Sequence, residues 1–195
     1  MYWWSKIDLA EGSILTDFLS LTNSKALTST ITYVGRSLAE SQDVADDIVA
    51  RLQLLWDHIL ASGNARKSKE VFAAFGWWFN TRYFSDAWAL DRLKASLELA
   101  EGKFEPVLDA LSRLTRLAGA YPKLVLECTK MIVLAANDYI ELWTKDIRAI
   151  LEMVLHSGDA ELSTGATNLI NELGSRGYHM YRILLKLGQD SRDDV

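Results

Sequence analysis

The three histidines are the side chains best able to bind a metal or carry a proton, but their spacing suits neither role. His58, His156 and His179 belong to no His-x-x-x-His or Cys/His pattern of the kind that binds zinc. Asp57 precedes His58, and adjacent side chains on a helix diverge, so the two are not expected to form a catalytic dyad. His156 falls at the end of an expected helix, where the helix dipole favours a cation. We therefore expect no metal site and interpret the histidines as surface or capping residues.

Motifs for nucleotide binding and for nucleophilic catalysis are also absent from the sequence. There is no Gly-x-x-x-x-Gly-Lys-Ser/Thr loop, no Gly-x-Gly-x-x-Gly turn and no Gly-x-Ser-x-Gly elbow. Cys128 is in register with Leu124 and Met131 on one side of an expected helix, which predicts a buried thiol and not a reactive thiolate. We expect a protein that is not an enzyme and binds no cofactor. The alternative is an enzyme whose pocket is assembled from scattered residues, which a sequence does not reveal.

Two groups of basic residues are candidates for binding a partner. Arg113 and Arg116 share one expected helix face, and Arg176, Tyr178 and Arg182 mix cations with an aromatic ring near the end of the chain. Such a mixture can hold phosphates and stack bases, which would suit a nucleic-acid-binding helical array. The simpler interpretation is a terminal helix whose tyrosines close the core and whose arginines face water. The net charge of −5 argues against nucleic acid as the partner.

Trp77 is a further candidate, because its position on the expected helix differs from that of its aromatic neighbours. At 3.6 residues per turn it lies about 200° around the helix from Phe75. The small residues Ala73 and Ala74 lie beside it and would allow another helix to approach. A neighbouring layer then covers Trp77, with Trp88 as the expected contact. In the alternative, Trp77 is an exposed anchor for a partner, since tryptophan is enriched among the residues that dominate interface energies.

The elements that would position these residues are predicted to be helices throughout. The 195 residues include only two prolines, 49% are hydrophobic and 24% are charged, as in an ordinary globular protein. No stretch alternates with a period of two, so we expect no sheet. Apolar residues recur at three- and four-residue steps in about ten segments. The segments are approximately 13–21, 24–40, 43–61, 68–81, 85–100, 104–119, 123–137, 139–156, 160–173 and 178–187.

The segment 104–119 shows the clearest division into a buried and an exposed face. The residues expected on its buried face are Phe104, Val107, Leu108, Leu111, Leu114 and Ala118. The residues expected on its exposed face are Asp109, Ser112, Arg113 and Arg116.

The segments 68–81 and 85–100 instead carry apolar residues on two sides, and a helix of that kind is normally packed between two neighbours. Short connections make successive helices antiparallel neighbours, and stacked hairpins bury both sides of a helix. We therefore predict an all-α fold of antiparallel hairpins stacked as a degenerate HEAT- or armadillo-like array, with a compact helical bundle as the alternative. The prediction treats residues 1–195 as a single helical domain.

Several short phrases resemble, in their order, the C-terminal helical regions of large bacterial multidomain proteins. These are NTP-hydrolysing and sirtuin-like proteins of the anti-phage defence type, and the resemblance covers about residues 50–185. The phrases are Leu55-Trp56, Phe75-Gly76-Trp77-Trp78-Phe79, Trp88-Ala89-Leu90 with Leu93, Ala118 with Tyr121-Pro122, Ile150-Leu151 with Gly158, and Ala166, Leu169-Ile170, Gly174 and Arg176-Gly177-Tyr178.

The resemblance implies a helical tail that serves as a sensor or scaffold, while separate N-terminal domains carry the chemistry. The chain would then be a fragment or a stand-alone copy of such a tail, and its partner would be another protein or another domain of a larger chain. The start of the sequence lacks the basic lead and apolar core of a signal peptide. No apolar run approaches the roughly 20 residues that span a bilayer. We therefore expect a cytoplasmic protein that does not contact a membrane.

Overall fold

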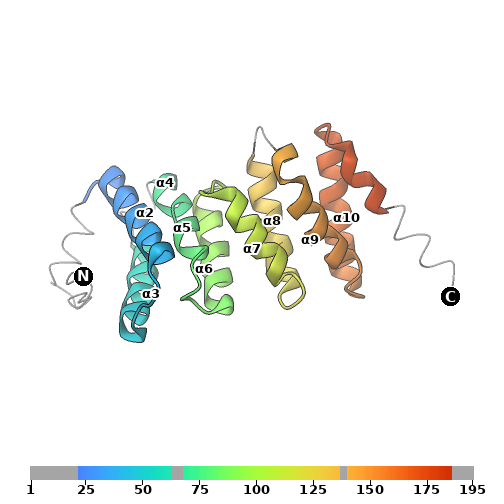
Figure 1. Ribbon diagram of the computed structural model, residues 1–195. Helices are drawn as coiled ribbons and strands as arrows, with labels where there is room; N and C mark the ends of the chain where they lie inside the picture. Colours follow the sequence, from blue (N-terminus) through green and yellow to red (C-terminus); the bar gives the residue numbers. More distant parts are fainter. Residues whose placement is uncertain (1–21, 63–67, 137–139, 186–195) are drawn as a thin grey trace. The chain divides into compact units, whose positions relative to one another are not determined.

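The computed structural model describes residues 22–62, 68–136 and 140–185, and within these ranges every regular element is a helix (Figure 1). The prediction of an all-α fold is confirmed. The expected helix at 13–21 lies outside the described residues. The α-helices are α2 (Ser24–Glu40), α3 (Asp46–Ala61), α4 (Lys69–Ala73), α5 (Gly76–Phe79), α6 (Asp86–Leu99), α7 (Val107–Leu117), α8 (Pro122–Ala135), α9 (Thr144–Leu155) and α10 (Ala160–Ser175). Two 3-10 helices, η3 (Ile140–Trp143) and η4 (His179–Arg182), complete the described elements.

The chain divides after Pro106 into two compact units, which are described separately. Unit 1 holds α2 to α6, and unit 2 holds α7 to α10 with η3 and η4. The prediction that residues 1–195 form one domain stays a prediction.

Unit 1 packs around a cluster of aromatic rings from α3, α5 and α6. Trp56 stacks on Phe75 with 4.6 Å between ring centroids. Trp78 lies parallel to Phe84 at 6.0 Å, and Trp88 contacts both Phe84 and Phe75. Trp88 therefore belongs to the same core as Phe75.

The expected helix at 68–81 is interrupted, and α4 and α5 are its two halves. The first α-helix of this segment ends at Ala73, and the second begins at Gly76. A β-carbon on Gly76 would lie 2.2 Å from the carbonyl oxygen of Glu105, so the backbone of α5 approaches the segment before Pro106 very closely. The α4–α5 segment contacts α2 on one side and α6 on the other. The prediction that its two apolar sides are both covered is confirmed.

Unit 2 consists of two antiparallel hairpins. In the first, α7 packs on α8, and in the second, α9 packs on α10. The hairpins stack so that α7 lies beside α9 and α8 beside α10 (Figure 1). This is the arrangement of two successive layers in a helical array. Four helices in contact also satisfy the compact-bundle alternative, so the continuous array stays a prediction.

The division of 104–119 into faces is correct at most positions and wrong at two. Leu111 and Leu114 are fully buried, as expected. Leu108 is 53% exposed, although the pattern placed it on the buried face. Arg113 is only 6% exposed, although the pattern placed it on the wet face. The helix begins at Val107 and not at residue 104. Phe104 therefore lies in the loop before the helix, which belongs to unit 1.

Candidate functional site

Of the two arginines predicted on 104–119, one lies at the surface. Arg116 is exposed, as expected. Arg113 is buried, and so the prediction that it offers a surface contact to a partner is wrong. The physical reason is that side chains three residues apart on a helix lie about 60° apart, so a long residue near the boundary of the apolar face can be enclosed by a neighbouring helix. The two arginines therefore do not form a common basic surface.

The C-terminal residues Arg176 and Arg182 are exposed, and both also contact other residues of unit 2. The Arg176 guanidinium donates to the Leu134 carbonyl at 2.7 Å and pairs with Glu172 at 3.2 Å. The Arg182 guanidinium lies against Gly174, where a β-carbon would approach its Nε to 2.7 Å. Tyr178 is half-buried. This use of the side chains weakens the case for a phosphate-binding cluster.

Tyr181 is buried in the core of unit 2, as the simpler interpretation predicted for the tyrosines of this segment. Tyr181 is 1% exposed. Burial raises the pKa of its phenol, and the nearby Thr144 hydroxyl offsets only part of that increase.

Trp77 is half-buried, and α2 is the helix that covers it. A β-carbon on Gly35 would lie 2.5 Å from the Trp77 Cβ, so the two helices touch through this glycine. The Arg36 guanidinium lies 4.3 Å from the centroid of the indole ring, in a cation–π contact. The covering helix is thus present as predicted, but the expected contact with Trp88 is wrong. Part of the ring stays accessible beside Arg36.

The sequence prediction missed Tyr33, an exposed residue of α2 next to the Arg36 that contacts Trp77. Tyr33 is 70% exposed. It lies three residues before Arg36 on α2, and side chains at that spacing are neighbours. We call Tyr33, Arg36 and Trp77 the anchor surface. Tyrosine, arginine and tryptophan are the residue types most enriched among dominant interface contacts. The spacing of Tyr33 and Arg36 was visible in the sequence, but the contact of Arg36 with Trp77 was not.

A cleft of about 350 Å³ adjoins the end of α2. Residues 38–42, at the end of α2 and just after it, form one wall, and Asn80–Tyr83, which follow α5, form the other. The walls are tied together, because the Tyr83 hydroxyl donates to the Ser41 carbonyl at 2.6 Å and Arg82 donates to the Gln42 carbonyl. Both amide atoms of Asn80 are shielded from solvent and have no hydrogen-bond partner.

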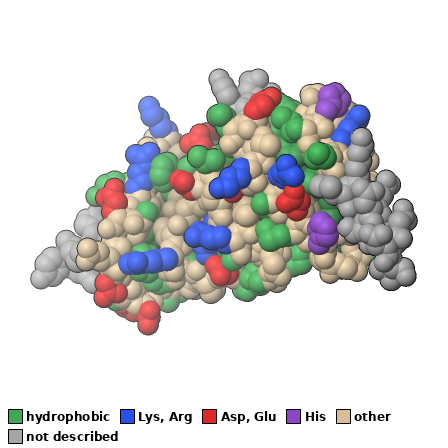
Figure 2. Space-filling model, turned by 45° about the vertical axis from the view of Figure 1, so that its right-hand side comes forward, with side chains coloured by type: hydrophobic (Ala, Val, Ile, Leu, Met, Phe, Trp, Pro, Cys, Tyr) green, Lys and Arg blue, Asp and Glu red, His purple; other side chains and the backbone are tan. Residues whose placement is uncertain are grey.

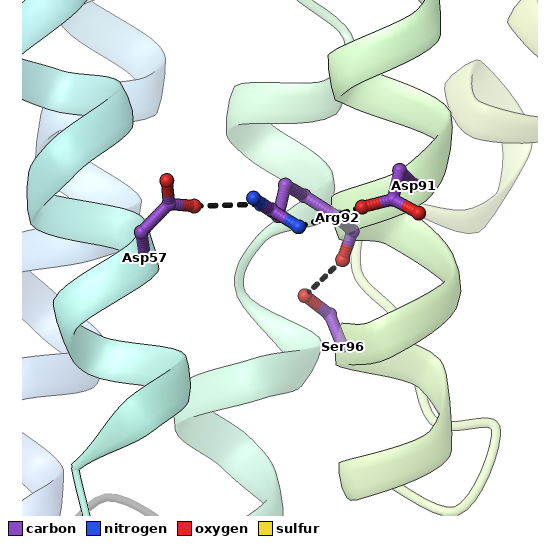
Figure 3. A network of polar contacts seen from close by, with 4 residues as sticks. All are labelled: Asp57, Asp91, Arg92 and Ser96. Carbon is purple, nitrogen blue, oxygen red and sulfur yellow. Dashed lines mark hydrogen bonds and ion pairs between the residues drawn. The ribbon is translucent and has the colours of Figure 1, made fainter.

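The polar network between α3 and α6 holds these helices together and offers no reactive group (Figure 3). Arg92 donates through Nε to Asp57 and through Nη1 to Asp91, each at 2.6 Å. Ser96 donates to the Arg92 carbonyl, a bond within α6. Asp57 therefore pairs with an arginine and not with His58, which is exposed. Half-exposed ion pairs of this kind contribute about 1 kcal/mol or less.

The remaining ionisable side chains are mixed in sign. On the face shown in Figure 2, the Lys and Arg side chains are interspersed with Asp and Glu side chains. Across residues 22–62, 68–136 and 140–185, no group of three His, Cys, Asp or Glu is placed to hold a metal ion. Cys128 is fully buried, as predicted. No helix within the described ranges has both the length and the apolar character needed to cross a bilayer.

We expect Gly35→Ala to lower the free energy of unfolding by about 1–3 kcal/mol, the usual cost of overpacking a tight contact. The new β-carbon would lie 2.8 Å from the Trp77 carbonyl carbon, which is backbone and cannot turn aside as a side chain can. Gly119→Ala is the control, since a β-carbon there meets nothing within 4 Å. Urea denaturation followed by circular dichroism measures both variants. Equal stability of the two would contradict the close approach of α2 to Trp77.

The fold and the site together define an all-helical protein with an aromatic and arginine-bearing surface beside a polar cleft in unit 1. Comparison with family models, with curated proteins and with solved structures finds no match for the chain.

Proposed function

We propose that the chain is a non-catalytic protein-interaction module that serves as a scaffold or sensor, and that the anchor surface of unit 1 contacts its partner. The observation that carries the proposal is the exposure of Tyr33 beside the stacked pair of Arg36 and Trp77. A single exposed aromatic residue is common on any protein. Tyr33 is one turn from Arg36, which contacts Trp77, so three residues of the types that dominate interfaces follow one another across this surface. The resemblance to sensor tails of bacterial defence proteins supports the same role.

A nucleic-acid partner is less favoured by the arrangement of charge. Affinity for nucleic acid depends on lysines and arginines that neutralise phosphates. Of the candidate arginines, Arg113 is buried and Arg176 is bonded to a carbonyl and to Glu172. The anchor surface contributes one arginine, whose charge already lies over an indole ring. We therefore favour a protein partner over a nucleic acid for the anchor surface.

The test uses a phage-displayed library of unstructured 12-residue peptides selected against the full chain. Fluorescence anisotropy then compares the affinity of the selected peptides for wild type, Tyr33→Ala and Leu142→Ala. Leu142 is the matched control, because it is also 70% exposed and lies in unit 2. We expect Tyr33→Ala to weaken binding about tenfold or more, equivalent to about 1.4 kcal/mol, while Leu142→Ala leaves it unchanged.

The proposal fails if the selected peptides bind Tyr33→Ala as tightly as wild type. It also fails if the chain prefers a single-stranded oligonucleotide whose affinity falls steeply as salt rises, because that dependence is the signature of phosphate contacts. Tyr33 is so exposed that its truncation should change stability by less than about 0.5 kcal/mol. Loss of binding by Tyr33→Ala will therefore report on the surface and not on unfolding.

A further inference from the structure

Leu108 and Leu142, which we call the leucine pair, leave apolar surface uncovered in unit 2. Leu108 lies in the first turn of α7 and is 53% exposed, and Leu142 lies in η3 and is 70% exposed. Single exposed leucines are common on soluble proteins and need no explanation. Two that adjoin each other do need one, because contiguous apolar surface is what association with another molecule buries.

The contact between α7 and α9 places the leucine pair side by side. The two helices run in the same direction (Figure 1), and Ser112 of α7 donates to the Asp146 carboxylate of α9 at 3.3 Å. Leu108 lies four residues before Ser112. Leu142 lies four residues before Asp146, where η3 continues into α9. Because side chains at this spacing share one face of a helix, both leucines lie about one turn from the bond that joins the helices.

The exposed charges around the leucine pair follow the same order on both helices. One carboxylate adjoins each leucine in the sequence, Asp109 on α7 and Glu141 in η3, and both are exposed. The next exposed charge along the chain is a cation in each case, Arg116 on α7 and Lys145 on α9. Each helix therefore starts with an acid beside its leucine and continues with a base one or two turns later.

This order of charges is complementary to itself when two copies meet with their helices antiparallel. A two-fold axis near the leucine pair places apolar surface on apolar surface. The same axis reverses the direction of the helices, so the acidic start of one copy faces the basic turn of the other. Each contact then occurs twice, as in every isologous interface. A partner with charges of one sign matches only half of this surface, whereas a second copy matches all of it.

We propose that a second copy of this chain covers the leucine pair, in a two-fold interface where the Glu141 carboxylate of each copy pairs with the Lys145 ammonium of the other. The leucines of the two copies pack on one another at the centre. This inference goes beyond the proposed function, because it concerns a different surface, in unit 2 and not in unit 1. Each dimer then carries two anchor surfaces.

The surface is small, and so we expect weak association. Specific, stable interfaces bury about 1,200–2,000 Å² in total, and weak or transient ones bury less. Two leucines from each copy, with the charged side chains around them, belong to the second class. The dimer should therefore form at high protein concentration and dissociate on dilution. Dilute samples used for urea denaturation are then monomeric, and their stability does not include the interface.

Sedimentation equilibrium of the full chain over a wide range of concentration tests the proposal. The mean mass of wild type should rise from that of the monomer towards twice that value. Leu142→Ala and Leu108→Ala should each raise the dissociation constant about tenfold or more, because a two-fold interface loses the apolar area twice. Leu54→Ala is the matched control, since Leu54 is 58% exposed but lies on α3 in unit 1, and it should associate as wild type does.

Exchanging the charges tests the two-fold geometry separately. Glu141→Lys and Lys145→Glu should each weaken association, because each substitution sets two pairs of like charges against each other. The double variant with both substitutions restores opposite charges across the interface and should recover most of the wild-type affinity. Both side chains are exposed, so the substitutions should leave the fold intact, which circular dichroism verifies.

Four results would overturn the inference. Wild type stays monomeric at the highest concentration, Leu142→Ala associates as wild type does, Leu54→Ala weakens association as strongly as Leu142→Ala, or the double charge variant associates no better than the single ones. All four leave the proposed function standing, because its test depends on Tyr33. If the peptides selected against the chain lose affinity for Leu142→Ala, the leucine pair binds a different protein, and the inference is overturned in that case too.

Discussion

Trp78→Ala is expected to lower the free energy of unfolding by about 3–5 kcal/mol, the range for truncating a fully buried tryptophan. The Trp78 side chain is 0% exposed. Its ring contacts Trp56 and Phe84, so the cavity left by alanine would open in the centre of unit 1. Its indole N–H also donates to the Ile31 carbonyl at 2.9 Å, and truncation removes this bond between α5 and α2. Urea denaturation followed by far-ultraviolet circular dichroism measures the loss.

Two variants separate the contributions to this loss. Trp78→Phe retains an aromatic ring and removes the bond to Ile31, so it should cost less than the alanine variant. Trp143→Ala removes a half-buried tryptophan from unit 2 and should also cost less. A cost below about 1 kcal/mol for Trp78→Ala would mean that α5 does not pack on α2 through this residue.

Local patterns were sufficient to predict α2 closely, because its signals lie within the helix and next to it. Asn23 accepts a hydrogen bond from the Ala26 amide and caps the helix, which begins at Ser24. Leu27, Ile31 and Leu38 are all buried on one face. The predicted bounds of 24–40 agree with the structure. Where the cap and the apolar face coincide, the sequence alone determines the element.

The break between α4 and α5 could not be predicted in the same way. Ala73 and Ala74 are good helix formers, the aromatic residues are intermediate, and a glycine inside a helical pattern is tolerated at a cost of about 1 kcal/mol. The reason for the break is tertiary: the Glu105 carbonyl occupies the space in which a side chain at position 76 would lie, and the Ala73 carbonyl accepts from the Glu105 amide. The contact between Gly76 and Glu105 joins residues far apart in the sequence, so it leaves no periodic pattern from which it could be predicted.

The candidate site shows the same division between local and distant information. Trp77 was identified from its angle on the helix, which is a local property. The cleft depends on the bond from Tyr83 to Ser41, which spans 42 residues. The unpaired amide of Asn80 is visible only when all neighbouring groups are placed. Arg113 was predicted to be exposed only because charged residues usually face water. The fold buries it instead.

Leu111→Ala is expected to lower the free energy of unfolding by about 2–5 kcal/mol, and Leu93→Ala by a similar amount in the other unit. Both side chains are 0% exposed. Each truncation removes a buried side chain and leaves a cavity that the surrounding helices fill only partly. Denaturation curves in urea, fitted for midpoint and slope, give the two losses.

Leu108→Ala is the decisive control, because Leu108 and Leu111 lie on the same helix and the sequence pattern assigned both to its buried face. At 53% exposure, Leu108 loses little contact on truncation, and we expect a change under about 0.5 kcal/mol. A large cost at Leu108 together with a small cost at Leu111 would mean that α7 is rotated about its axis relative to this structure.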